Sequence, residues 1–256
     1  MLKDFTKEKF DILIQAGQSN AEGYGFGPTE EPWEPDDRVW VLNGDFTISQ
    51  AAEKVTGNDI QSDFSLSFVR EYIRDGRLEE GRGILILRTA VGGTGFLDGH
   101  WKPEDDLYLR MIEMTRTALE LNPENRLVAL LWHQGETDTS YDATFSGHYD
   151  RLMTLVKGVR ETFGRPDLPF IAGDFVQDWK GLNIEVCTPV VDAIRAVCRD
   201  CGNGGFVETD GLLSNRQELD YNPLGWEDEI HFSSCSTRPE SVALALYVTV
   251  RSFGIL

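Results

Sequence analysis

Short, mostly apolar runs alternate with amphipathic stretches along this chain, and the alternation restricts the fold more than any other feature. Apolar character sustained over only three to six residues is typical of strands covered on both faces, as in a parallel sheet. We expect strands over residues 11–16, 39–42, 83–87, 127–132, 169–172 and 205–207. The amphipathic stretches predict helices over residues 63–78, 105–121, 143–163, 188–200 and 239–252, with caps at Asp63, Asp105 and Thr188. The pattern predicts a three-layer α/β fold.

The length of the chain and the lack of internal divisions favour one domain. At 256 residues the chain lies near the upper limit for a single hydrophobic core. No repeat, low-complexity tract or linker divides residues 1–256. Residues 22–37 and 202–226 are rich in loop-forming residues. Because ligands bind beyond the carboxyl ends of strands in open parallel sheets, we expect both loops to border that crevice.

The charge balance argues against two classes of partner. The chain has 43 acidic and 24 basic residues, a net charge of −19, and no basic tract. Such a charge repels phosphate backbones and anionic lipids, so we expect no nucleic acid or membrane partner. No apolar stretch approaches the ~20 residues that a membrane helix needs, and the first residues do not form a secretory signal. We therefore expect a soluble, cytoplasmic protein, and the sequence carries no signal for an oligomeric state.

Neither the cysteines nor the glycines form a cofactor motif. Cys198 and Cys201 have a suggestive spacing, but no second pair or nearby histidine accompanies them. Low cysteine usage agrees with a reducing compartment. The glycine cluster at residues 92–95 lacks both the Gly-x-Gly-x-x-Gly and the Walker patterns of nucleotide-binding loops. We expect free thiols and no metal or organic cofactor.

Ser19 directly follows the first predicted strand, within Gly17-Gln18-Ser19-Asn20. A strand that ends there would place a small polar side chain at the rim of the sheet, where α/β enzymes keep a nucleophile. An isolated serine after a strand is more often a helix N-cap, and a serine hydroxyl attacks poorly unless a base takes its proton. Ser19 is therefore a nucleophile only if the chain supplies such a base.

His231 is the best candidate for that base. Among the four histidines it alone has a carboxylate three residues before it, on a predicted turn. In such a turn Asp228 can reach the imidazole Nδ1 and leave Nε2 to face Ser19. The alternative is a surface histidine beside an ordinary solvated acid. Taken together, Ser19, Asp228 and His231 suggest a serine hydrolase.

Polar residues appear abruptly after the strand predicted over residues 127–132, in Trp132-His133-Gln134-Gly135-Glu136-Thr137-Asp138. The Gln134 amide can donate a hydrogen bond to a developing oxyanion. Glu136 can orient a neighbour, or accept from His231 as a competing acid. The alternatives are a turn that satisfies its own backbone and a metal site on His133 and Glu136, which lacks a third ligand.

The glycines that follow the strand at residues 83–87 let the backbone approach a substrate closely, and the Gly93 N–H is a natural second oxyanion donor. An ordinary glycine-rich loop is the alternative. Three tryptophans fall in predicted loops, where they either stack on sugar faces or pack as partly exposed residues: Trp101, Trp179 and Trp226.

These motifs, in this order, resemble the sialate O-acetylesterase branch of the SGNH hydrolases, which includes the acetylxylan esterases of carbohydrate esterase family six. The resemblance covers nearly the whole chain and rests on residues 17–20, 92–95, 132–138 and 228–232. The Gly-x-Ser-x-Gly elbow of the α/β-hydrolases is absent, because Ala21 stands where its last glycine would be.

The resemblance implies a flavodoxin-like three-layer α/β/α sandwich around a mostly parallel sheet of about five strands. It implies Ser19 as nucleophile, His231 as base and Asp228 as the acid that orients it. The implied oxyanion donors are the N–H groups of Ser19 and Gly93 and the side chain of Gln134, where the broader SGNH pattern has asparagine. A further proposal for this branch makes the glutamate of the Gln-Gly-Glu block the triad acid. That role would fall on Glu136 here.

The activity implied by the resemblance is removal of O-acetyl groups from carbohydrates, such as acetylated xylan-type sugars or sialic acid, through an acyl-enzyme. The expected partner is a small-molecule or oligosaccharide acetyl ester. Two alternatives remain open: hydrolysis of another short acyl ester or thioester, and carbohydrate binding without turnover.

Overall fold

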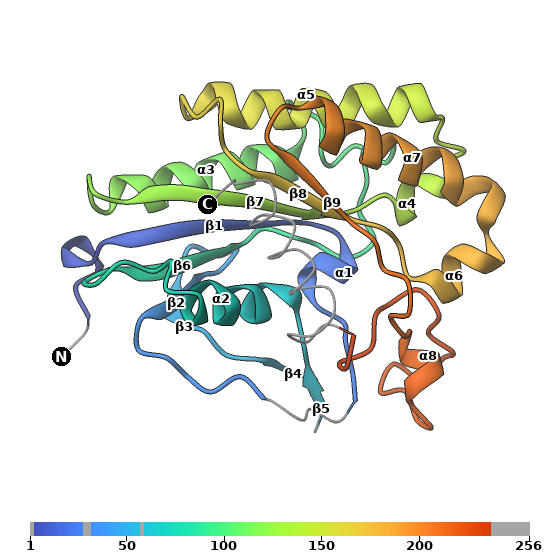
Figure 1. The fold of residues 1–256 in the computed structure, drawn as a ribbon, viewed down its shortest axis with the longest axis horizontal. Coiled ribbons are helices and arrows are strands. Elements are labelled where there is room, and N and C mark those ends of the chain that lie inside the picture. The colour runs from blue at the N-terminus through green and yellow to red at the C-terminus, as the bar shows by residue number, and fades with distance from the viewer. Residues whose placement is uncertain (1–2, 28–31, 57–58, 237–256) are drawn as a thin grey trace.

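The computed structural model describes residues 3–27, 32–56 and 59–236, and in this part of the chain a seven-stranded sheet lies between helices (Figure 1). The strands are β1 (Phe10–Gly17), β2 (Val39–Leu42), β3 (Ile48–Gln50), β6 (Gly83–Arg88), β7 (Arg126–His133), β8 (Phe170–Gly173) and β9 (Gly204–Val207). All neighbours in the order β3-β2-β6-β1-β7-β8-β9 pair in parallel except β2 and β3, which pair antiparallel. The predicted α/β fold with a mostly parallel sheet is confirmed.

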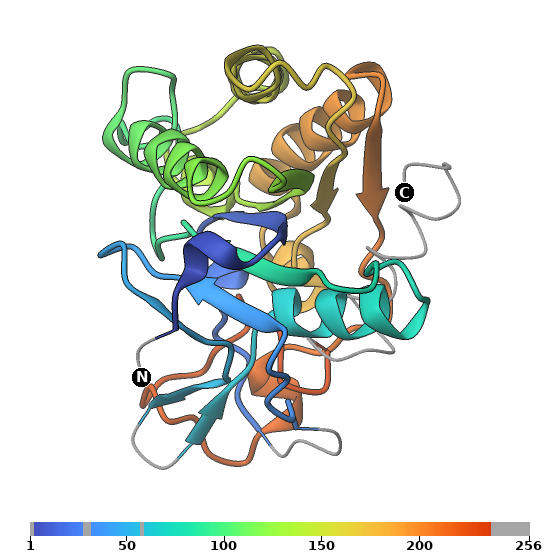
Figure 2. The ribbon, with the colours of Figure 1, turned by 90° about the vertical axis from the view of Figure 1, so that its left-hand side faces the viewer.

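Helices cover both faces of the sheet (Figures 1 and 2). One face packs against α3 (Asp106–Glu120), α5 (Phe145–Thr162) and α7 (Ile184–Asp200), and the other packs against α2 (Phe64–Arg74). The short elements are η1 (Phe5–Lys7), α1 (Ser19–Glu22), α4 (Glu136–Thr139), α6 (Gln177–Leu182) and α8 (Asn215–Glu218), with a hairpin of β4 (Lys54–Thr56) and β5 (Asp59–Gln61). The helix predicted over residues 239–252 lies outside the described residues. None of the described helices is both long and apolar enough to cross a bilayer.

Strand β1 runs through the centre of the molecule, and all eight of its residues are buried. Ile12 and Ile14 point into the core shared with α3, α5 and α7, whereas Leu13 points into the core shared with α2. Alternate side chains of a strand face opposite sides of the sheet, so a strand covered on both sides must be apolar nearly throughout. This arrangement explains the short continuous apolar runs.

The strand order places a crevice at one end of the sheet. The five strands β6-β1-β7-β8-β9 follow the flavodoxin order, and β2 and β3 extend the sheet beyond the five strands expected. Because β1 lies between β6 and β7, the segments that leave these three strands meet at their carboxyl ends. Figure 1 shows α1 and α4 at this end of the sheet.

Two predicted helix starts agree with the structure and one is wrong. Asp63 caps α2 and accepts from the N–H groups of Ser65 and Leu66. Asp105 precedes α3, although its carboxylate accepts from the Lys102 N–H instead of the helix. Thr188 is not a cap, because α7 begins at Ile184. The Thr188-Pro189 pair resembles a cap followed by proline at the first helical position, but here it lies inside the helix.

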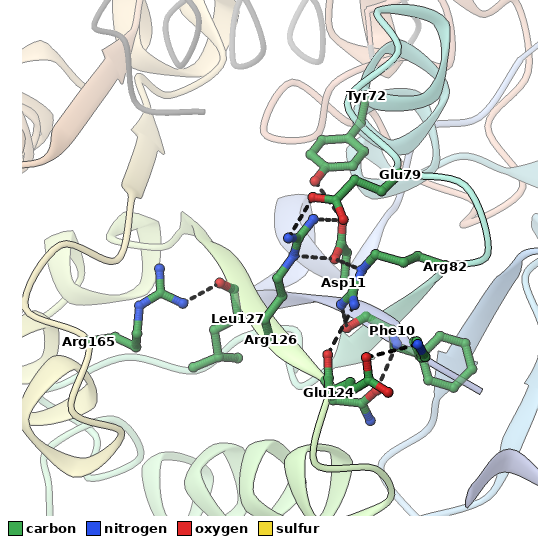
Figure 3. A network of polar contacts seen from close by, with 11 residues as sticks. Phe10, Asp11, Tyr72, Glu79, Arg82, Glu124, Arg126, Leu127 and Arg165 are labelled. Atoms are coloured by element: carbon green, nitrogen blue, oxygen red, sulfur yellow. Dashed lines mark hydrogen bonds and ion pairs between the residues drawn. The ribbon is translucent and has the colours of Figure 1, made fainter. Parts of the chain in front are cut away.

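A polar network holds the opposite end of the sheet, where the central strands begin (Figure 3). The fully buried carboxylate of Asp11 on β1 accepts from the Tyr72 hydroxyl and from the Nε atoms of Arg82 and Arg126, each at 2.7 Å. Arg82 also donates to the backbone oxygens of Phe10 and of Glu124 (see Figure 3). Burial and the neighbouring carboxylate raise the pKa of Tyr72, so its hydroxyl stays a donor. The network ties α2 and β7 to β1.

Candidate active site

Ser19 is the first residue of α1, directly beyond the carboxyl end of β1. The N-cap position belongs to Gln18, whose N–H donates to the His133 oxygen at 2.8 Å, so the helix-cap interpretation of Ser19 is wrong. Gly17 makes the sharp exit possible: its φ is +124°, and a Cβ there would lie 2.0 Å from the His133 oxygen. In the described part of the chain, the Ser19 hydroxyl has no hydrogen-bond partner, and the residue is 7% exposed.

His231 and Asp228 are in direct contact on the segment that follows α8. The imidazole Nδ1 lies 3.0 Å from Asp228 Oδ2 and 2.9 Å from Oδ1, and the His231 N–H donates to Oδ1 at 3.2 Å. The buried carboxylate also accepts from Asn215 Nδ2 at 2.8 Å. Because Nδ1 donates its proton to a carboxylate, Nε2 carries the lone pair that a general base needs.

Ser19 and His231 line the same hollow, of about 1080 Å³. Both loops predicted to border the crevice contribute to it, through Tyr24 from residues 22–37 and through Trp226 from residues 202–226. The Tyr24 ring stacks on the His231 ring with 4.9 Å between centroids, and Trp226 meets His231 edge-on at 6.0 Å. Two aromatic rings that line the hollow therefore pack against the imidazole.

The three tryptophans predicted near a sugar have different positions. Trp226 is 46% exposed in the hollow, and Trp179 lines it from α6 instead of from a loop. Trp101 as a sugar-stacking residue is wrong, because it is fully buried. It packs edge-on against Trp132 at 5.1 Å and donates its indole N–H to Thr94 Oγ1. Although Trp101 lies in a loop, its ring is buried because the loop packs on the hydrophobic core.

The glycine loop after β6 reaches the hollow through Gly93. The Gly92 N–H donates to Glu22 Oε2 at 2.7 Å, which fixes the loop against α1. Gly93 has a φ of +71° and lines the hollow beside Ser19. Neither the Ser19 nor the Gly93 N–H has an acceptor among residues 3–27, 32–56 and 59–236. Two such donors beside a serine can hold an oxyanion.

Gln134 lies beneath the hollow and is not among the residues that line it. Its Nε2 donates to Asp138 Oδ2 at 3.0 Å and lies 3.4 Å from Gln18 Oε1. The same Gln18 oxygen accepts from the N–H of Thr137 at 3.1 Å. These hydrogen bonds hold the turn after β7. For Gln134 Nε2 to donate to an oxyanion, its 3.4 Å contact with Gln18 Oε1 would have to break.

Glu136 contacts residues other than His231. Its Oε1 accepts from Asn20 Nδ2 at 2.8 Å and lies 3.0 Å from His133 Nε2. Burial acts to raise the pKa of Glu136, but His133 and the hydrogen bond from Asn20 bring that pKa below its ordinary value. Of the two candidate acids, Asp228 is the one in contact with His231. Across the described residues, no cluster of three or more histidine, cysteine or acidic side chains could hold a metal.

Comparison with known proteins identifies the family. Residues 9–238 match the family described as "Carbohydrate esterase, sialic acid-specific acetylesterase". The chain belongs to this family. The match includes all the predicted site residues, from Ser19 to His231.

The curated relatives that match this chain are distant in sequence. The chain is 26% identical over 126 residues to the Escherichia coli protein named "Probable 9-O-acetyl-N-acetylneuraminic acid deacetylase", an alignment that covers 40% of this chain and 39% of that protein. It is 26% identical over 180 residues to a "Probable carbohydrate esterase" of Arabidopsis thaliana, covering 62% and 66%. The alignments thus span less than two thirds of either relative.

The fold is shared with a solved structure over nearly its full length. The crystal structure of NanS superimposes with a TM-score of 0.81 at 20% identity, covering 97% of this chain and 98% of that chain. At this identity the likeness concerns the fold alone.

Two asparagines at the candidate site were not predicted as functional residues. Asn20 follows Ser19 and contacts Glu136, and Asn215 donates to Asp228. Asn20 lay within the Gly17-Gln18-Ser19-Asn20 motif, so its position was a signal that could have been used. Asn215 lay in a loop-rich region 13 residues before Asp228, and nothing local indicated that contact.

Proposed function

We propose that this chain is a serine esterase that removes O-acetyl groups from carbohydrates through an acyl-enzyme. One observation carries the proposal: His231, which Asp228 holds through Nδ1, shares a hollow with Ser19 at the carboxyl ends of β1, β6 and β7, in a chain of the sialic acid-specific acetylesterase family. A hydroxyl, an imidazole and a buried carboxylate are the groups that nucleophilic acyl transfer requires.

In the first half of the reaction, Ser19 Oγ attacks the acetyl carbonyl while His231 Nε2 takes the hydroxyl proton. Asp228 holds the ring in the required tautomer and stabilises the imidazolium that forms. The N–H groups of Ser19 and Gly93 receive the carbonyl oxygen as it becomes negative, and Gln134 is a third candidate donor. The sugar oxygen then leaves with the proton from His231, and the acetyl group stays on Ser19.

The second half repeats these roles with water as the nucleophile. His231 takes a proton from water, the water oxygen attacks the acetyl-enzyme, and Ser19 leaves with the proton as acetate is released. No step in this sequence calls for a metal or an organic cofactor. Exposed Trp226 and Tyr141 at the hollow offer apolar faces on which a sugar ring can stack.

Acetate release from a panel of O-acetylated sugars tests the proposal. The panel contains acetylated xylan, O-acetylated sialic acid and simple acetylated monosaccharides, with the Ser19→Ala variant as the matched control. We expect the wild-type protein to release acetate and the variant to lose that activity. Equal acetate release by the two proteins would contradict the role of Ser19.

The same panel separates the remaining alternatives. Faster hydrolysis of octanoyl than of acetyl esters would favour an esterase for longer acyl chains. Saturable sugar binding without acetate release would favour a carbohydrate-binding protein. A cytoplasmic location, which the low cysteine usage of the chain favours, belongs to the same proposal, and cell fractionation tests it.

A further inference from the structure

Asn20 is a buried amide whose hydrogen-bonding groups are all used. It is 4% exposed and follows Ser19 in α1. Its Nδ2 donates to Glu136 Oε1 at 2.8 Å and to the Ile230 oxygen at 3.0 Å, and its Oδ1 accepts from the Phe232 N–H at 3.1 Å. Two donor hydrogens and one acceptor thus bind three groups that lie more than a hundred residues away along the chain.

The two backbone groups bound by Asn20 flank His231. Ile230 and Phe232 are its immediate neighbours, so one side chain holds the backbone on both sides of the imidazole. Asn20 is itself fixed at its backbone, because the first turn of α1 returns to Gln18 and the Gln18 N–H donates to the His133 oxygen. The amide therefore links the backbone of Ser19 to that of His231 through a side chain with only two rotatable bonds.

Glu136 determines which way the Asn20 amide faces. A carboxylate only accepts hydrogen bonds, so it must face the NH₂ group of the amide. With Nδ2 on Glu136, the amide oxygen is left for the Phe232 N–H. His133 Nε2, 3.0 Å from the same Glu136 oxygen, fixes the carboxylate in turn. Hydrogen bonds through Asn20 thereby connect Glu136, after β7, to the backbone beside His231.

We propose that Asn20 is a positioning residue that sets the placement of His231 relative to Ser19, and that Glu136 orients Asn20 for this task. The inference rests on the proposed esterase function. Asn20 touches neither the substrate nor the reacting atoms in this account. It acts because a base displaced by about 1 Å costs on the order of 10²-fold in rate.

Three variants test the proposal with 4-nitrophenyl acetate as the substrate. We expect Asn20→Ala to lower kcat about 10²-fold while KM changes less than threefold, since Asn20 is not among the residues that line the hollow. Asn20→Asp should be at least as impaired, because its carboxylate would face that of Glu136. The double variant Asn20→Asp with Glu136→Gln restores one donor and one acceptor to the pair, so it should recover at least tenfold of the lost kcat.

Asn125→Ala is the matched control. Asn125 is also buried and also links distant segments, accepting from the Phe10 N–H at 2.7 Å and donating to the Ala118 oxygen at 2.8 Å, but at the opposite end of the sheet. We expect its loss to lower the melting temperature and leave kcat unchanged.

Three results would overturn the inference: wild-type kcat in a folded Asn20→Ala variant, an equal effect of Asn125→Ala on kcat, or a double variant no more active than Asn20→Asp. A wild-type protein without esterase activity would instead remove the proposed function, and the positioning role with it. Failure of the positioning role and failure of the proposed function are thus distinguishable, because only the latter leaves the wild-type protein without esterase activity.

Discussion

At the residue scale, two carboxylates compete for the role of supporting His231. Asp228 contacts the imidazole directly, whereas Glu136 contacts Asn20 and His133. We expect Asp228→Ala to lower kcat about 10³- to 10⁴-fold, by analogy with triad aspartates, and Glu136→Ala to cost at least tenfold less. Steady-state kinetics on 4-nitrophenyl acetate measures both variants. If Glu136→Ala proved the more damaging change, the acid would have to be reassigned.

A partly buried glutamate, Glu53, should make stability depend on pH. Burial, aided by the negative charge of Asp63, raises the pKa of Glu53 from 4.5 to about 7. The folded state therefore binds this proton more tightly than the unfolded state, and the stabilisation is present below pH 4.5 and lost as the pH rises through 7. Its size is at most roughly 3 kcal/mol, since one pKa unit corresponds to about 1.4 kcal/mol.

Glu53→Gln tests this pH dependence, because glutamine keeps the shape and cannot titrate. We expect the wild-type free energy of unfolding to decrease between pH 5 and pH 8 by more than that of the variant. Urea titrations at several pH values give both curves. Parallel curves for the two proteins would show that Glu53 does not titrate in this window.

At the element scale, the Asp11 network fixes the ends of the central strands that lie away from the hollow with Ser19 and His231 (Figure 3). Asp11→Ala would leave the guanidinium of Arg82, which is largely buried, without its carboxylate. Breaking a buried ion pair in this way costs about 3–5 kcal/mol. We expect a melting temperature lower by about 10 °C and a kcat per folded molecule close to that of the wild type. An unchanged melting temperature would contradict the structural role of the network.

Also at the element scale, the length and burial of each strand explain whether the sequence could predict it. All six predicted strands are present, because strands covered on both faces need continuous apolar runs. The strands β3, β4 and β5 were missed, since each is only three residues long and mostly faces solvent, so no apolar pattern marks it. The start of α7 was misplaced because a threonine before a proline imitates a cap.

At the scale of the whole molecule, the stabilising polar network and the proposed site lie at opposite ends of the sheet. The polar network around Asp11 lies where the central strands begin, and the hollow with Ser19 and His231 lies beyond their carboxyl ends. Substitutions at the two ends should therefore have separable effects on unfolding and on kcat.

The separation of two residues along the whole chain determines whether the sequence could predict their contact in the site. Asp228 and His231 are three residues apart, so their contact was predictable from a local pattern. The contacts of Asn20 with Glu136 and with the backbone beside His231 span 116 to 212 residues, and only the assembled sheet brings those segments together. The burial of Gln134 beneath the hollow likewise depends on packing around the turn after β7.

Labelling with a serine-directed phosphonate tests the central claim, that Ser19 is activated for acyl transfer by His231. Intact-mass and peptide analysis would follow the wild-type protein and the His231→Ala variant. We predict one adduct on Ser19 of the wild-type protein, complete loss of acetyl-ester hydrolysis on labelling, and at least 10²-fold slower labelling of the variant. An adduct on another residue, or hydrolysis that persists after Ser19 is labelled, would contradict the account.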